Sequence, residues 1–125
     1  MTDSVERLYE GVIRARQGDP TKSRTARLLR SGRAKMAKKL AEEAVEVVID
    51  AMNGSREAVV KESADLIYNL VVLWVSSGIQ PKEVWKEMER RERLFGIAEK
   101  LSKEVIDDPR RKVVALDARR LRKRR

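Results

Sequence analysis

Residues 38–70 read KKLAEEAVEVVIDAMNGSREAVVKESADLIYNL, and their pattern is the strongest indication of how the chain folds. Apolar residues recur at helical spacing on both sides of the break at 53–55, which predicts two antiparallel helices joined by a turn. Residues three apart share a helical face, so two acidic pairs form: Glu43 with Glu46, and Glu62 with Asp65. Carboxylates gathered in one gap repel unless a cation lies between them, and their hard oxygen atoms favour Mg²⁺. The sequence therefore predicts a magnesium site for a phosphorylated substrate.

The composition excludes several kinds of chemistry. The 125 residues include no cysteine and no histidine, which rules out disulfides, thiolate nucleophiles and imidazole bases or ligands. Hydrolytic chemistry must then use carboxylates, lysines, tyrosines and a metal-bound water. No apolar run has transmembrane length and the N-terminus shows no signal-peptide pattern, so we expect a cytoplasmic protein with no membrane contact.

The rest of the chain also has helical periodicity and lacks strand signals. We expect an all-α antiparallel bundle of four to five helices, completed by oligomerisation. The predicted elements are a first segment around 5–13, a short helix to Leu29 capped by Ser23 or Thr25, a helix over 33–52, a helix from the cap Ser55 to about Ser76 that stops at Gly78, a helix opened by Pro81 and interrupted at Gly96, and a last piece over 97–105.

Two helices have distinctive apolar faces. Between residues 64 and 75 nearly every position is apolar, which predicts a helix buried on most sides and covered by a second subunit, in a dimer or larger homo-oligomer. Asp65 lies inside this stretch, where an unpaired acid is costly. Trp74 is expected in the core or at an interface, as is Trp85. The second of these helices, predicted over 33–52, has an inner apolar stripe that consists of Met36, Leu40, Ala44, Val47, Val48 and Ala51.

The positive charge concentrates towards the C-terminus. The net charge is +9, and residues 97–125 contain 11 basic and 5 acidic residues. We predict a domain over 1–106 followed by a basic extension over 107–125. A basic terminal run is typical of a solvated tail, and non-specific contact with a polyanion is the functional alternative. A helical nucleic-acid-binding protein that uses this tail therefore stays open as a third class of function.

Three stretches resemble one known family. GDPTKSRTARLL at 18–29, KKLAEEAVE at 38–46 and ESADLIYNL at 62–70 are similar to phosphoribosyl-ATP pyrophosphatases. These enzymes belong to the all-α, MazG-like NTP pyrophosphohydrolases, whose signature is E-E-x-x-E followed by E-x-x-D. Two positions depart from the family pattern, which usually has Gly where Ala41 stands and His where Asn69 stands.

The resemblance implies Mg²⁺-dependent hydrolysis of phosphoribosyl-ATP to phosphoribosyl-AMP and pyrophosphate, the second step of histidine biosynthesis. It implies that Mg²⁺ is held by Glu43, Glu46, Glu62 and Asp65. Glu42 is the candidate acceptor for the proton of the attacking water, with a solvent-facing position as the alternative. Five basic residues are candidates for binding the substrate phosphates, with plain surface solvation as the alternative: Lys22, Arg24, Arg27, Lys38 and Lys39. A paralogue that removes dUTP or damaged NTPs would use the same acids.

Overall fold

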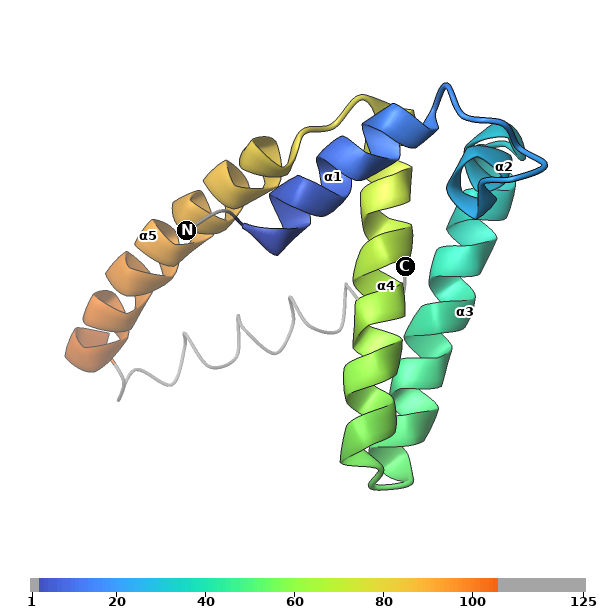
Figure 1. The fold of residues 1–125 in the computed structure, drawn as a ribbon. Coiled ribbons are helices and arrows are strands. Elements are labelled where there is room, and N and C mark those ends of the chain that lie inside the picture. Colours follow the sequence, from blue (N-terminus) through green and yellow to red (C-terminus); the bar gives the residue numbers. More distant parts are fainter. Residues whose placement is uncertain (1–2, 106–125) are drawn as a thin grey trace. The chain divides into compact units, whose positions relative to one another are not determined.

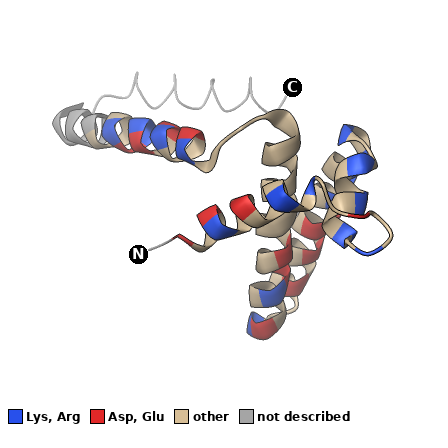
Figure 2. Cartoon of the chain, turned by 45° about the horizontal axis from the view of Figure 1, so that its top comes forward, with Lys and Arg blue, Asp and Glu red and all other residues tan. Residues whose placement is uncertain are grey.

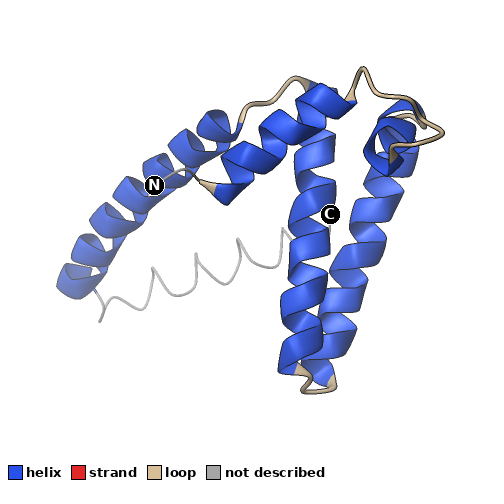
Figure 3. Ribbon diagram, viewed as in Figure 1, coloured by secondary structure: helices blue, strands red, loops and turns tan. Residues whose placement is uncertain are grey.

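The computed structural model describes residues 3–105, with side chains as far as Gly96, and these residues form helices without any strand (Figures 1 and 3). The prediction of an all-α fold is therefore confirmed, whereas its completion by oligomerisation stays a prediction. The five helices of this part of the chain are α1 (Ser4–Ala15), α2 (Arg24–Arg30), α3 (Arg33–Met52), α4 (Arg56–Ser77) and α5 (Pro81–Val105).

The chain divides into two compact units, Met1–Trp85 and Lys86–Arg125. The first unit contains α1 to α4 and the beginning of α5. The predicted basic extension over 107–125, and its boundary with the domain over 1–106, lie outside the described residues. The nucleic-acid hypothesis that depends on this extension stays a prediction for the same reason.

Short polar residues cap three of the helices, and two of these caps, Ser23 and Ser55, are predicted from the sequence. Ser23 caps α2 and Ser55 caps α4, each accepting a hydrogen bond from a backbone N–H three residues on, at 3.1 and 3.3 Å. Asp3 caps α1 by accepting from the N–H of Val5 at 3.0 Å. These side chains satisfy N–H groups that have no partner within the helix. The end of α4 is set by Gly78, whose φ of +70° is the left-handed conformation that glycine adopts without penalty.

The predicted interruption at Gly96 is wrong, because α5 continues from Pro81 to Val105. A glycine inside a helix costs only about 1 kcal/mol relative to alanine. The residues on either side are mostly strong helix formers, including Glu92, Arg93 and Leu94. In addition, Glu87 bonds Arg90 at 2.7 Å and Arg91 at 3.2 Å one turn ahead. These bonds lower the pKa of Glu87 to about 2.

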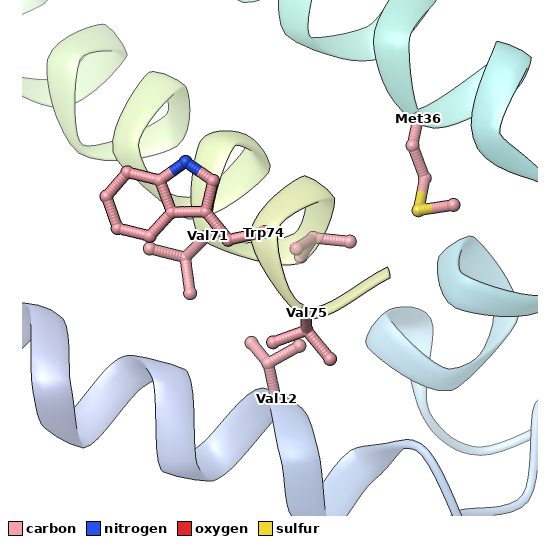
Figure 4. Close-up of a cluster of buried hydrophobic side chains, with 6 residues drawn as sticks. Val12, Met36, Val71, Trp74 and Val75 are labelled. Atoms are coloured by element: carbon pink, nitrogen blue, oxygen red, sulfur yellow. The ribbon is translucent and has the colours of Figure 1, made fainter. Parts of the chain in front are cut away.

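The core of the first unit lies where α1 crosses the C-terminal half of α4 (Figures 1 and 4). It consists of buried residues from three helices: Val12, Met36, Val71, Val72, Trp74 and Val75. The rings of Trp74 and Trp85 meet edge to face, with centroids 6.1 Å apart, which confirms the expected packing role of the tryptophans. Arg16 adds a polar connection by donating to the carbonyl of Val75 at 2.7 Å.

The two helices α3 and α4 run antiparallel and are joined by the turn at Asn53-Gly54, as predicted (Figure 1). Towards this turn their outer faces are left uncovered, since α1 and α2 pack at the other end of the pair. Two residues of the predicted inner stripe, Val48 and Ala51, are therefore exposed, with Val48 at 60%. Among the described residues, no helix has the length and apolar content needed to cross a membrane.

Two glycines provide a matched test of this backbone. Gly78→Ala should lower the free energy of unfolding by about 1 kcal/mol, because alanine is disfavoured at positive φ. Gly11 lies inside α1, where an added Cβ meets only the end of the Arg14 side chain at 3.8 Å. Gly11→Ala should therefore raise the free energy of unfolding by about 0.5–1 kcal/mol. Urea denaturation measures both values, and a stabilising Gly78→Ala would contradict the observed helix end.

Candidate active site

The acids predicted from the sequence meet across the α3–α4 hairpin. One carboxylate oxygen from each of Glu43, Glu62 and Asp65 lies within 4.8 Å of the other two. Glu43 comes from the middle of α3 and the other two come from the first half of α4. The turn at 53–55 makes the helices antiparallel, so residues about 20 positions apart in sequence come to face each other. The hairpin is therefore the element that assembles the site.

The donor set fits a small hard cation. Neighbouring ligand oxygens of Mg²⁺ lie roughly 3 Å apart and opposite ones roughly 4.2 Å, so these three carboxylate oxygens would have to move closer together to occupy part of an octahedron. Two buried oxygens, Oε2 of Glu43 and Oε2 of Glu62, have no hydrogen-bond partner among the described residues. A buried carboxylate oxygen without a donor is costly, and a bound cation would remove that cost.

Glu46 belongs to the same group of acids, because it is a close neighbour of Glu62. The neighbouring carboxyl groups of Glu46, and then of Glu43, raise the pKa of Glu62 to about 7 because they favour its protonated form, and burial contributes further. Such sharing of a proton is expected where like charges are held together without a counter-ion. All four predicted metal ligands are thus in one neighbourhood, although their binding of a metal stays a prediction.

The burial of the acids differs from the expectation. Asp65 was expected to be enclosed by the apolar stretch around it, yet it is exposed, whereas Glu43 is the buried acid at 9%. The reason is that the core covers the C-terminal half of α4, and Asp65 lies in the other half. An exposed acid beside a buried one gives the site one side open to a ligand.

A pocket of about 570 Å³ opens beside these acids. Its walls combine two acids with four basic residues and several polar or apolar groups: Glu43, Asp65, Arg24, Arg27, Lys35, Lys39, Ser31, Leu28, Tyr68 and Asn69. Figure 2 shows the same separation of charge, with acids along the α3–α4 hairpin and basic residues around α2 and the start of α3. Acids that can hold a cation next to cations that can hold phosphate form an arrangement suited to a metal–polyphosphate ligand.

The loop before α2 is rigidly built. Asp19 accepts hydrogen bonds from the backbone N–H and the hydroxyl of Thr21 at 2.9 and 2.8 Å, which also lower the pKa of its carboxyl group. Gly18 lies against the start of α2, where a Cβ would come within 3.1 Å of the Ala15 carbonyl oxygen. Arg27 donates from Nε to the carbonyl of Pro20 at 3.1 Å, so its guanidinium is held by this loop.

The structure separates the predicted substrate-binding residues into two groups. Arg24, Arg27 and Lys39 line the pocket, and Lys39 also pairs with Glu43 at 3.7 Å. Lys22 and Lys38 are exposed and do not belong to the set of residues that lines it.

Glu42, the predicted general base, is exposed on α3 and also lies outside the pocket-lining set. It is not one of the three acids that converge within 4.8 Å. Its catalytic role stays a prediction.

Sequence reasoning missed Lys35 as a site residue. Lys35, Lys39 and Glu43 follow one another at intervals of four, so a single stripe of α3 faces the pocket. That spacing could have identified Lys35. Tyr68 belongs to the quoted motif but had no predicted role, since the acids alone carried the argument.

Asn69 stands where the family pattern has histidine, and it is buried at 3% exposure. Its side-chain N–H donates to the backbone carbonyl of Asp65 at 2.8 Å, one turn earlier in α4. This bond fixes the amide orientation, and its oxygen is left without a donor among the described residues. Asn69 therefore adds a neutral acceptor beside the acids where a histidine could carry a positive charge.

Comparisons with known proteins all lead to one family. The sequence model of the phosphoribosyl-ATP pyrophosphohydrolase family matches residues 5–92. The chain is 60% identical to phosphoribosyl-ATP pyrophosphatase 2 of Rhodopseudomonas palustris over all of both chains, and 59% identical to the protein of the same name in Bradyrhizobium diazoefficiens over 99% of each. It is 50% identical to phosphoribosyl-ATP pyrophosphatase of Granulibacter bethesdensis over 82% of this chain and 64% of that protein. The first two matches extend past the region of the family model into the basic C-terminal residues.

The raised pKa of Glu62 predicts a pH dependence of stability in the metal-free protein. Between pH 4.5, the ordinary value for a glutamate, and about 7, folded Glu62 keeps a proton that the unfolded chain has lost. The free energy of unfolding should therefore fall as the pH rises through this window and level off above it. Denaturation in the presence of a chelator measures this slope.

Glu62→Gln should remove most of this slope, whereas Glu57→Gln should keep it, because Glu57 is an exposed acid of α4 that pairs with Lys61. Equal slopes in Glu62→Gln and the wild type would contradict the shared proton. Added Mg²⁺ should restore stability at pH 7 to 8 in the wild type, because the cation replaces the lost proton.

Proposed function

Because the chain belongs to the phosphoribosyl-ATP pyrophosphohydrolase family, we propose that it hydrolyses phosphoribosyl-ATP between the α- and β-phosphates, giving phosphoribosyl-AMP and pyrophosphate in the second step of histidine biosynthesis. The observation that carries the proposal is the pocket in which Glu43 and Asp65 face Arg24, Arg27 and two lysines. A metal–triphosphate needs both the acids and the basic residues of this pocket, because the metal binds carboxylates and the phosphate oxygens bind cationic side chains.

The proposed reaction depends on Mg²⁺ held by Glu43, Glu46, Glu62 and Asp65. When bound, Mg²⁺ neutralises phosphate charge and lowers the pKa of a coordinated water. The four acids supply the negative charge that selects a divalent cation, and the convergence of three of them within 4.8 Å supports this assignment. Lys39 pairs with Glu43 across 3.7 Å, and from there its ammonium group can turn to a phosphate oxygen as substrate enters.

The two arginines of α2 are proposed to bind the substrate at the opposite wall. Both Arg24 and Arg27 line the pocket. Phosphoribosyl-ATP carries a phosphate on its second ribose in addition to the triphosphate, and arginine forms bidentate bonds with such groups. Arg27 bonds the loop carbonyl of Pro20 through its Nε, and within the described part of the chain this leaves both terminal nitrogens available to the substrate. Nucleotides without a second phosphate would lose these contacts.

A second copy of the chain is proposed to cover the exposed apolar face of α3 and α4. This face consists of six large apolar residues that are 43–83% exposed: Val45, Val48, Ile49, Met52, Val60 and Ile67. The C-terminal half of α4 is already covered by α1, so the argument for a homodimer or larger assembly now rests on this face. Val48→Glu should convert the assembly to monomers in analytical ultracentrifugation. Ala34→Glu, on an exposed position of the same helix, is the control, and a monomeric wild type would contradict the proposal.

The enzymatic proposal is tested by measuring pyrophosphate release from phosphoribosyl-ATP, dUTP and the canonical and damaged NTPs. We expect turnover of phosphoribosyl-ATP that requires Mg²⁺ and that falls at least about 100-fold in Asp65→Asn, because a metal ligand is lost. Glu57→Gln, on the same helix but in an exposed ion pair, should stay within about twofold of the wild type. Glu42→Gln should lower kcat about 100-fold with KM little changed if Glu42 is the base.

Three outcomes would contradict parts of this proposal. Preferential turnover of dUTP or of a damaged NTP would replace the biosynthetic substrate while keeping the chemistry. Full activity in Asp65→Asn would remove the carboxylate site from the mechanism. Full activity in Glu42→Gln would exclude Glu42 as the base and leave the metal assignment intact.

A further inference from the structure

A hydrogen bond between two hydroxyl groups joins the metal-site helix to the arginine-bearing helix. Thr25 Oγ1 of α2 and Tyr68 Oη of α4 lie 2.5 Å apart, and the pair is partly buried. Either oxygen can donate. The two residues are 43 positions apart in the sequence, so the contact is part of the tertiary structure and fixes how the two helices meet. We call it the Thr25–Tyr68 contact.

The Thr25–Tyr68 contact adds a directional bond to the packing of α2. This helix has only 7 residues, with no acid in its first turn. A helix this short is unstable alone, and its position depends on what it packs against. Ala26 is fully buried, and Leu28 and Leu29 pack against the core, but these apolar contacts are not directional. The bonds of Asp19 and Arg27 stiffen the preceding loop without connecting it to α4.

The Thr25–Tyr68 contact joins two helices that each contribute to the pocket, although Thr25 is not among the residues that line it. Tyr68 is three residues after Asp65, so the two side chains share a face of α4, and both line the pocket. Thr25 lies between the pocket-lining residues Arg24 and Arg27. A movement of α2 relative to α4 would thus change the distance between the guanidinium groups and the carboxylates. Displacements of about 1 Å are sufficient to weaken the binding of a rigid, multiply charged ligand.

We propose that Thr25 and Tyr68 are positioning residues, whose shared hydrogen bond holds Arg24 and Arg27 at the correct distance from the acids for a metal–polyphosphate to bridge them. The inference rests on the proposed function for the identity of the ligand. Neither hydroxyl is assigned a part in the chemical step. The contact therefore acts mainly on substrate affinity.

Isosteric variants test this proposal. Tyr68→Phe and Thr25→Val each remove one hydroxyl and keep the shape of the side chain. Each should raise KM for phosphoribosyl-ATP about three- to tenfold, the effect of losing one partly buried hydrogen bond, while kcat changes by less than about threefold. The double variant should be no worse than either single one, because both remove the same contact. Thr25→Ser keeps the hydroxyl and should retain a KM within about twofold of the wild type.

The control is Tyr9→Phe, which removes the hydroxyl of a tyrosine that packs on the same core and does not line this pocket. It should leave KM unchanged, and all variants should keep the melting temperature of the wild type within a few degrees. Three results would overturn the proposal: single effects on KM that multiply in the double variant, Thr25→Val with wild-type KM, or failure of Thr25→Ser to rescue.

A binding measurement separates this inference from the proposed function. Inorganic pyrophosphate with Mg²⁺ can be titrated calorimetrically into the wild type and the same variants. If the wild type does not hydrolyse phosphoribosyl-ATP, the proposed substrate is wrong, and the titration then decides the inference. Pyrophosphate binding about three- to tenfold weaker in both Tyr68→Phe and Thr25→Val would support it. Equal affinities, or a wild type that binds no pyrophosphate, would overturn it.

Discussion

The structure depends on keeping four carboxylates together between two antiparallel helices. Glu43, Glu46, Glu62 and Asp65 repel one another, and in the metal-free protein part of that repulsion is relieved by a proton that stays on Glu62 up to a pH of about 7. Like charges at this separation lower stability unless another interaction compensates. The compensation comes from packing at the other end of the hairpin, where Val12 of α1 meets the C-terminal half of α4. Burial of each such side chain contributes about 1.5–3 kcal/mol.

The two halves of α4 have different roles, and this difference explains several features of the structure. Its C-terminal half is apolar and covered by α1, which fixes the helix in place. Its N-terminal half carries Glu62 and Asp65, which face α3. The pocket is lined by Asp65, by Glu43 of α3 and by Arg24 and Arg27 of α2, so a ligand that contains both a metal and phosphates can bind the acids and the arginines together. Asn69 lies near the junction of the two halves, and its bond to the carbonyl of Asp65 connects the core to the site.

Much of this arrangement could be predicted from the sequence. Helix bounds, the caps Ser23 and Ser55, the turn at 53–55 and the acid pairs follow from local spacing and residue type, which short-range physics determines. Burial was less predictable, because it depends on where a third helix packs. Asp65 is exposed and Val48 faces solvent, since α1 reaches only one end of the hairpin. Gly96 failed as a helix stop because its neighbours are strong helix formers. The Thr25–Tyr68 contact could not be foreseen, since it joins residues 43 positions apart.

The central claim is that these acids form a site for a divalent cation. Anomalous diffraction from crystals grown with Mn²⁺, which prefers the same oxygen ligands as Mg²⁺, tests it directly. We expect an anomalous peak between the α3 and α4 helices, with oxygen atoms of Glu43, Glu62 and Asp65 about 2.0–2.3 Å from it. Absence of a peak there at saturating Mn²⁺, or ligation by other residues alone, would show that these acids do not form the cation site.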